Sequence, residues 1–139
     1  MIKLSIIVPV YNMAADGKLE YCLDSLVNQT MAPGSYEIIA VDDCSTDNSL
    51  EILRSYQDRY PDRFIAIASD RNRHQGGAKN IGLAGAKGEW IGFIDAAEDF
   101  AAHRLSNAAT SERLLLHMGD GATPFGIPAV LCLFWRRRR

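Results

Sequence analysis

Residues 37–47 (EIIAVDDCSTD) contain the side chains best placed for chemistry, because a hydrophobic run ends in two adjacent acids, Asp42 and Asp43. An unpaired charge beside an apolar core costs free energy, so a buried strand has no structural need for two acids at its tip. In an open α/β sheet, ligands bind outside the carboxyl ends of the strands. The acid pair therefore indicates a binding site at the end of a predicted strand.

Two further apolar runs end in polar side chains. Residues 5–12 (SIIVPVYN) end at Tyr11 and Asn12, and residues 88–95 (GEWIGFID) end at Asp95. Three predicted strands thus deliver polar groups to one edge of a sheet, where we expect them to border a common cleft.

These groups suit a nucleoside diphosphate. Tyr11 offers a flat face on which a base can stack, and Asp43 can accept a hydrogen bond from the ring N–H of a base such as uracil. Lys79 follows two glycines at a predicted helix start, where a cation and free backbone N–H groups favour phosphate. Asp95 and the acids after it could hold a divalent ion that bridges phosphate oxygens.

Each feature also has a simpler structural interpretation. Tyr11 and Asn12 could close a turn, Asp42 and Asp43 could cap the following helix, and Lys79 could be a solvated surface charge. No spacing among the histidines indicates a metal site, and we expect loop or surface positions for all three: His74, His103 and His117.

The elements that must position these residues alternate between strand and helix. Apolar runs predict strands, and a one-sided apolar period predicts a helix in which Leu19, Cys22, Leu23, Leu26 and Val27 face inward. Ser45, Thr46 and Asp47 offer capping oxygens to a second helix, and Gly88 is expected to end a third. The predicted strands are 4–10, 37–41, 64–68 and 90–94. This order indicates an α/β fold with an open, parallel, Rossmann-like sheet.

The bulk composition narrows the function. The 139 residues fit one domain, and 47% hydrophobic with 23% charged residues is ordinary for a globular protein. A net charge of −2 gives no reason to expect nucleic acid as a partner. No apolar window reaches the roughly 18–20 residues of a membrane span, so we expect a cytoplasmic protein. The absence of G-x-G-x-x-G and G-x-x-x-x-G-K-[ST] motifs argues against a dehydrogenase-type dinucleotide fold and a P-loop.

Four ordered motifs carry a family resemblance. They are residues 5–12, residues 41–47 (VDDCSTD), Asn72 with residues 76–82 (GGAKNIG), and residues 88–95. In this order and spacing the chain resembles the N-terminal, donor-binding half of family 2 glycosyltransferases, which have the GT-A fold. The sheet is then expected to be a GT-A sheet truncated after about four strands.

The resemblance implies transfer of a sugar, with inversion, from a nucleotide-diphosphate-sugar donor to a hydroxyl of a saccharide or lipid-linked acceptor. It places Lys79 where the family usually has Arg, a better bidentate partner for phosphate. The implied donor-binding residues are Pro9, Tyr11, Asn12, Asp42, Asp43, Lys79 and Asp95.

The resemblance also implies Mg²⁺ or Mn²⁺, held by an acidic motif that Asp95 opens. In the family this motif is usually Asp-x-Asp-Asp, whereas residues 95–99 here are DAAED. Ala97 replaces an expected metal ligand, and Glu98 or Asp99 would have to substitute for it.

The likeness divides the chain into a partial donor-binding domain, residues 1–99, and a divergent tail, residues 100–139. No catalytic base is assigned, because the family carries it in the acceptor-binding half, which the tail does not resemble. A non-catalytic nucleotide-binding module or inactive remnant is the alternative function. The apolar run 127–135 before Arg136–Arg139 could be a non-native terminus, an edge strand, or a segment at the inner membrane surface. A sheet cut after four strands would expose an edge and favour self-association.

Overall fold

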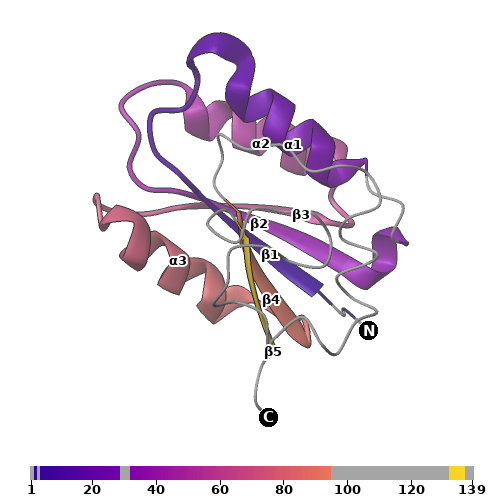
Figure 1. Cartoon of the computed structure of the whole chain (residues 1–139). Coiled ribbons are helices and arrows are strands. Elements are labelled where there is room, and N and C mark those ends of the chain that lie inside the picture. Colours follow the sequence, from indigo (N-terminus) through magenta and orange to yellow (C-terminus); the bar gives the residue numbers. More distant parts are fainter. Residues whose placement is uncertain (1, 3, 29–31, 95–131, 137–139) are drawn as a thin grey trace.

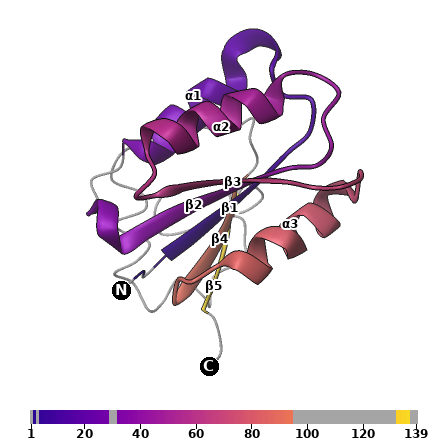
Figure 2. The ribbon, with the colours of Figure 1, turned by 180° about the vertical axis from the view of Figure 1, so that it is seen from behind.

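The computed structural model describes residues 2, 4–28, 32–94 and the backbone of 132–136. A five-stranded sheet in the order β3-β2-β1-β4-β5 forms its centre. Helices α1 and α2 cover one face of the sheet, and α3 covers the other (Figures 1 and 2). The elements are β1 (Leu4–Val10), α1 (Lys18–Val27), β2 (Tyr36–Asp42), α2 (Ser49–Arg59), β3 (Phe64–Ala68), α3 (His74–Gly85), β4 (Trp90–Ile94) and β5 (Cys132–Arg136), with single 3₁₀ turns at Ala15–Gly17 and Pro33–Ser35.

Strands β1, β2, β3 and β4 are parallel, as the alternation of strands and helices predicts. All residues of β2 are buried, and in β1 only Pro9 is half-buried. Strands covered on both faces bury both sets of alternating side chains, which explains their continuous Ile- and Val-rich runs. The predicted α/β fold is confirmed.

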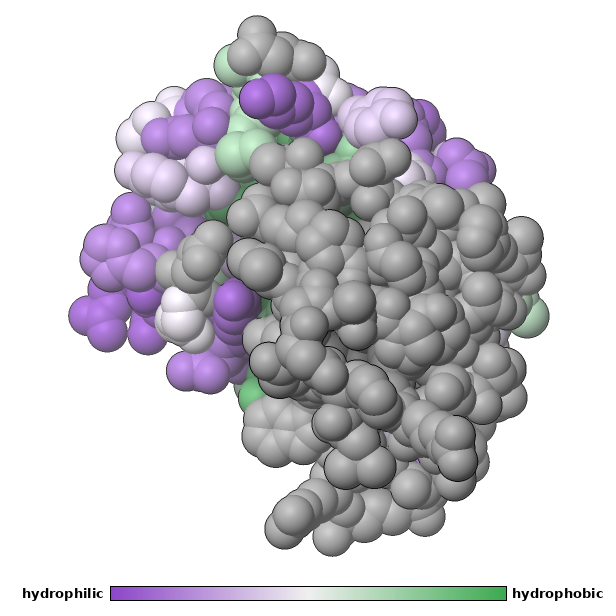
Figure 3. All heavy atoms as spheres, in the orientation of Figure 1, coloured by the Kyte–Doolittle hydropathy of each residue, from purple (hydrophilic) through white to green (hydrophobic). Residues whose placement is uncertain are grey.

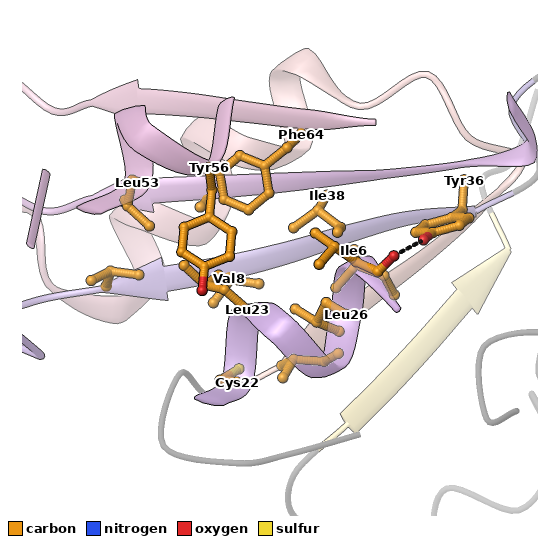
Figure 4. Close-up of a cluster of buried hydrophobic side chains, with 14 of the residues drawn as sticks. Ile6, Val8, Cys22, Leu23, Leu26, Tyr36, Ile38, Leu53, Tyr56 and Phe64 are labelled. Carbon is orange, nitrogen blue, oxygen red and sulfur yellow. Dashed lines mark hydrogen bonds between the residues drawn. The ribbon is translucent and has the colours of Figure 1, made fainter. Parts of the chain in front are cut away.

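The face beneath α1 and α2 holds the larger hydrophobic core (Figure 4). All five predicted inward residues of α1 are buried, and Leu53 and Tyr56 of α2 join them. The Tyr36 hydroxyl in β2 donates a hydrogen bond to the carbonyl of Val27, the last residue of α1 (3.2 Å). These contacts fix both helices over β1 and β2.

Helix α3 packs closely on the opposite face because it consists largely of small residues. A Cβ atom added at Gly82 would lie 2.6 Å from Cγ2 of Ile7 in β1 and 3.4 Å from Cγ2 of Val41 in β2. Only glycine therefore lets the helix backbone approach both central strands. The described residues around α3 and its preceding loop present mainly hydrophilic groups to solvent (Figure 3).

The predicted end of α3 at Gly88 is wrong, because the helix ends at Gly85 and the chain is extended from residue 86. Gly88 is buried against β1, where an added Cβ would lie 2.5 Å from the Ser5 nitrogen. Its own N–H donates to Ser5 Oγ (2.8 Å), and Ser5 Oγ donates to Glu37 Oε1 (2.6 Å). The Lys87 N–H also donates to Glu37 Oε1 (2.7 Å). This buried network joins the amino ends of β1 and β2 to the residues just before β4.

The outer sides of β3 and β4 are covered in different ways. On the outer side of β3, the Ala66 N–H donates to Gln57 Oε1 (2.8 Å) and the Phe64 N–H donates to the Tyr60 carbonyl (2.9 Å). Side-chain and loop acceptors thus occupy backbone donors that another strand could use.

At the other edge, β5 pairs antiparallel with β4, with Gly92 opposite Phe134. An edge strand, one of the three alternatives for the tail, is thus present at 132–136, while a non-native origin and a place at the membrane surface stay predictions. The expected sheet of about four strands gains a fifth, so the edge of β4 is covered. Residues 95–131, which connect the two strands, lie outside the described part of the chain, and self-association stays a prediction.

The close approach of α3 can be tested at two glycines. Gly82→Ala is expected to lower the free energy of unfolding by about 1–3 kcal/mol, because the new methyl group overlaps Ile7. Gly85→Ala is the matched control, since its Cβ would have only an ordinary 4.0 Å contact with Ile67. The control is expected to be neutral or to gain roughly 0.5–1 kcal/mol from helix propensity. Urea unfolding measures both, and a Gly82→Ala variant as stable as the wild type would contradict this packing.

Candidate functional site

The loops that follow β1, β2 and β3 meet at one edge of the sheet. Val10 pairs with Asp42, and Asp42 pairs with Ala68, so the carboxyl ends of these strands are level. The chain runs outward from β1 to β2 and β3 and then returns to β4 on the other side of β1. In open α/β sheets, ligands bind beside such a reversal of strand order, outside the carboxyl ends of the strands.

Asp43 lies at the centre of this edge and is only 3% exposed. Its N–H donates to the Val10 carbonyl (2.8 Å), and its Oδ1 accepts a hydrogen bond from the Arg73 N–H (2.7 Å). The residue therefore connects the end of β1 with the loop that starts α3. Asp43 thus already has one structural role, through Oδ1.

Asp42 is equally buried but has a different environment. Its Oδ2 accepts a hydrogen bond from the Ser45 N–H (3.1 Å), whereas its Oδ1 is buried and has no hydrogen-bond partner among the described residues. Neither acid caps α2, because that helix begins at Ser49. A buried acceptor without a partner is costly, so Asp42 Oδ1 has unused capacity for one further donor.

Tyr11 and Asn12 follow β1 directly. The Tyr11 side chain is 47% exposed, although it is one of the largest hydrophobic groups in the described chain. Asn12 adopts a left-handed conformation (φ 49°), and its Oδ1 accepts a hydrogen bond from the Thr46 N–H (2.8 Å). Pro9 is half-buried and pairs with Val41. The predicted turn at Asn12 and an exposed aromatic face are thus both present.

Asp47 organises the start of α2. Its Oδ1 accepts hydrogen bonds from the N–H (2.9 Å) and hydroxyl (2.6 Å) of Ser49, and its Oδ2 accepts one from the Ala14 N–H (3.1 Å). Burial raises the pKa of the Asp47 carboxyl, but these hydrogen bonds outweigh it and hold the pKa below its ordinary value. The Ser49 hydroxyl also accepts a hydrogen bond from the Met13 N–H (2.9 Å).

Lys79 lies in the first half of α3 and is half-buried. Its Nζ is 5.6 Å from the ring centroid of Phe93, near the carboxyl end of β4. The lysine therefore sits beside the strand that leads into Asp95, not out in solvent as an isolated surface charge.

The proposed metal ligands cannot be located in the same way. Asp95, Glu98 and Asp99 lie outside the described residues. Within residues 2, 4–28 and 32–94, no group of three or more His, Cys, Asp or Glu side chains could hold a metal ion.

Sequence reasoning overlooked the residues that tie the loops together. Arg73 contributes through its backbone N–H, which no side-chain pattern could reveal. The prediction that Ser45 and Thr46 cap the second helix is wrong, because Asn48 directly precedes α2 and makes no side-chain capping hydrogen bond. Ser45 and Thr46 bond to Asn12 instead. The sequence does offer one signal for these contacts, because a run of three small polar residues is longer than one helix cap requires.

Comparison with known proteins agrees with this arrangement. Residues 5–109 match the sequence model of the family described as Glycosyl transferase family 2, which is more than half of the chain. The chain belongs to that family.

Two similar proteins with named activities come from Bacillus spizizenii and Staphylococcus aureus. This family 2 chain is 45% identical over 93 residues to the poly(ribitol-phosphate) beta-glucosyltransferase of Bacillus spizizenii, covering 67% of this chain and 14% of the relative. It is 31% identical over 134 residues to the Staphylococcus aureus poly(ribitol-phosphate) beta-N-acetylglucosaminyltransferase TarS, covering 92% of this chain and 23% of TarS. The chain thus spans well under a third of these two relatives.

Solved structures confirm the GT-A fold. TarS 1–349 superposes with a TM-score of 0.70 at 31% identity, covering 78% of this chain and 31% of the TarS chain. The mannosyltransferase PcManGT from Pyrobaculum calidifontis, in complex with GDP-Man and Mn²⁺, gives 0.72 at 27% identity, covering 81% and 33%. TarS 1–349 has also been solved with UDP-GlcNAc. In the described part of this family 2 chain, no helix is long and apolar enough to cross a membrane.

The charge of Asp47 makes the stability of the site depend on pH. Because the native pKa is below the unfolded value of about 3.9, the ionised carboxylate stabilises the folded state at neutral pH. Asp47→Asn keeps one acceptor and removes the charge, so we expect a loss of roughly 0.5–1 kcal/mol at pH 7. This difference should shrink as the pH falls below about 4. Urea unfolding at both pH values measures it; a difference independent of pH would contradict the role of the charge.

Proposed function

We propose that this domain binds the nucleoside diphosphate part of a nucleotide-sugar donor at the carboxyl edge of the sheet, for transfer of the sugar to an acceptor hydroxyl. One observation carries the proposal. The β1–β2 register sets the exposed ring of Tyr11 directly after a strand whose neighbour ends in the buried acids Asp42 and Asp43.

The base would stack on Tyr11 and donate its ring N–H to the acid pair. A carboxylate that is 3% exposed is a strong acceptor, because little water competes for it. Asp43 uses Oδ1 for the Arg73 N–H, and Asp42 has a buried Oδ1 without a partner in the described chain. Both acids therefore retain acceptor capacity for the base or the ribose, and Pro9 would border the same pocket.

The diphosphate would extend toward the start of α3. The first turn of a helix offers free backbone N–H groups and a partial positive charge. Lys79 adds a full positive charge beside the end of β4. The proposed phosphate site would therefore lie on the α3 face of the sheet, opposite α1 and α2.

We also propose that Asp95, with Glu98 or Asp99, holds Mg²⁺ or Mn²⁺ when the donor binds. The proposal rests on the sequence and on Mn²⁺ in the PcManGT structure. Such an ion would neutralise charge that develops on the departing diphosphate. The described residues supply no metal site of their own, so no further step is assigned to the ion.

The acceptor is proposed to be a hydroxyl of a cell-envelope saccharide or a lipid-linked glycan. Support comes from the relatives, two of which are named for poly(ribitol-phosphate) glycosylation. A cytoplasmic location, with the basic residues Arg136–Arg139 near the inner membrane surface, is part of the same proposal.

Tyr11 provides the test of the base pocket. Tyr11→Ala is expected to weaken UDP binding by about 5- to 150-fold, because stacking of one base on an aromatic ring is worth about 1–3 kcal/mol. Tyr11→Phe keeps the ring and should bind UDP like the wild type. Calorimetric titration of the full chain measures each affinity.

Tyr21→Ala is the matched control, since Tyr21 is also an exposed tyrosine (66%) but lies on α1 and not on a strand-end loop. Its UDP affinity should be unchanged. If Tyr11→Ala and Tyr21→Ala bind UDP equally well, the proposed base pocket is wrong.

A turnover assay separates transfer from binding alone. A transferase should consume UDP-glucose or UDP-GlcNAc in the presence of Mn²⁺ or Mg²⁺, and Asp95→Asn should reduce the rate and the metal dependence of UDP binding. UDP binding without turnover would instead support a non-catalytic nucleotide-binding module. If the wild-type chain binds neither UDP nor GDP at any metal concentration, both functions are excluded.

A further inference from the structure

Asn12 makes the densest set of contacts between two loops of the site. Its Oδ1 accepts hydrogen bonds from the Thr46 N–H (2.8 Å), the Thr46 hydroxyl (3.2 Å) and the Asp47 N–H (3.4 Å). Its own N–H donates to Ser45 Oγ (2.9 Å). One short side chain thus fastens the loop after β1 to the loop after β2.

These contacts hold the backbone on one side of Tyr11. On its other side, the Val10 carbonyl accepts the Asp43 N–H (2.8 Å). Tyr11 is therefore flanked by two connections to the same neighbouring loop. The position of its backbone relative to Asp43 is consequently set by Val10 and Asn12.

We propose that Asn12 is a positioning residue, which holds Tyr11 at the correct distance and angle from Asp43 and does not itself contact the base. The inference rests on the proposed function and refines it, because it replaces a direct nucleotide contact by Asn12 with an indirect role. The amide oxygen of Asn12 is already occupied by three donors from residues 46 and 47.

The contacts lie where they affect geometry more than stability. Asn12, Thr46 and Asp47 are all exposed, so their N–H groups can bond to water when the amide oxygen is removed. Loss of the contacts then leaves few unsatisfied groups, but it frees two loops to move independently. Nucleoside affinity should therefore respond more strongly than the free energy of unfolding.

Asparagine meets two separate requirements at this position. The backbone is left-handed (φ 49°), a region that Gly, Asn and Asp occupy much more readily than other residues. The side chain must also supply a short acceptor oxygen with two lone pairs. Aspartate satisfies both requirements, glycine satisfies only the first, and alanine satisfies neither.

This difference defines the experiment on the full chain. Uridine and UDP affinities are measured by calorimetry for Asn12→Asp, Asn12→Gly and Asn12→Ala. Uridine carries no phosphate, so the added charge of Asn12→Asp has no anionic ligand to repel. Uridine affinity should be within about 2-fold of wild type for Asn12→Asp. It should fall about 5- to 10-fold for Asn12→Gly, with the urea midpoint nearly unchanged. Asn12→Ala should lose at least as much affinity and also some stability.

A double-mutant cycle with Tyr11→Ala distinguishes positioning from contact. If Asn12 acts through Tyr11, adding Asn12→Gly to Tyr11→Ala should change uridine affinity by less than about 2-fold. If Asn12 touched the ligand directly, the two losses would add. Additive losses overturn the positioning role.

The remaining outcomes separate this role from the proposed function. Hydrogen exchange without ligand should show faster exchange of the Thr46 amide in Asn12→Gly than in the wild type; equal rates overturn the connection between the loops. If the wild-type chain binds uridine and Asn12→Gly binds it with the same affinity, only the role of Asn12 is refuted. A wild-type chain that binds none of uridine, UDP and GDP refutes the proposed function, and the role of Asn12 with it.

Discussion

The parallel pairing of β1 with β2 is the constraint on which the candidate site depends. In this register Val10 lies opposite Asp42, so the polar residues at the ends of the two strands lie at the same level of the sheet. The Asp43 N–H extends the pairing by one hydrogen bond to the Val10 carbonyl. A shift of one residue would move every side chain of a strand to the other face. The exposed Tyr11 and the buried acid pair are neighbours for this reason.

A buried polar network at the amino ends of the strands supports this register. Glu37, Ser5 and the backbone of residues 87 and 88 satisfy one another in a region where an unpaired carboxylate would be costly. Close contact between Gly88 and Ser5 makes this possible. The two ends of the strands thus have different roles. The amino ends fix the alignment of the strands, and the carboxyl ends carry the polar side chains of the candidate site.

Strand and helix positions were largely predictable because burial leaves a strong pattern in the sequence. Strands buried on both faces require apolar runs, and β1, β3 and β4 have the predicted bounds. The end of α3 was mispredicted, because a glycine can end a helix or permit close packing and local sequence does not distinguish them. Strand β5 could not be assigned, since an apolar run before four arginines suits an edge strand, a membrane surface or a loose terminus equally well.

The sequence by itself determined the family, the fold class and the residue types at the strand ends, because these depend on local pattern and order. Only the tertiary structure decided what each polar group does. Asp43 bonds to a backbone N–H from residue 73, and Asn12 bonds to residues 45–47, and both contacts join segments that are distant in the chain. Such pairings follow from strand register and loop conformation, which arise only when the whole sheet is assembled.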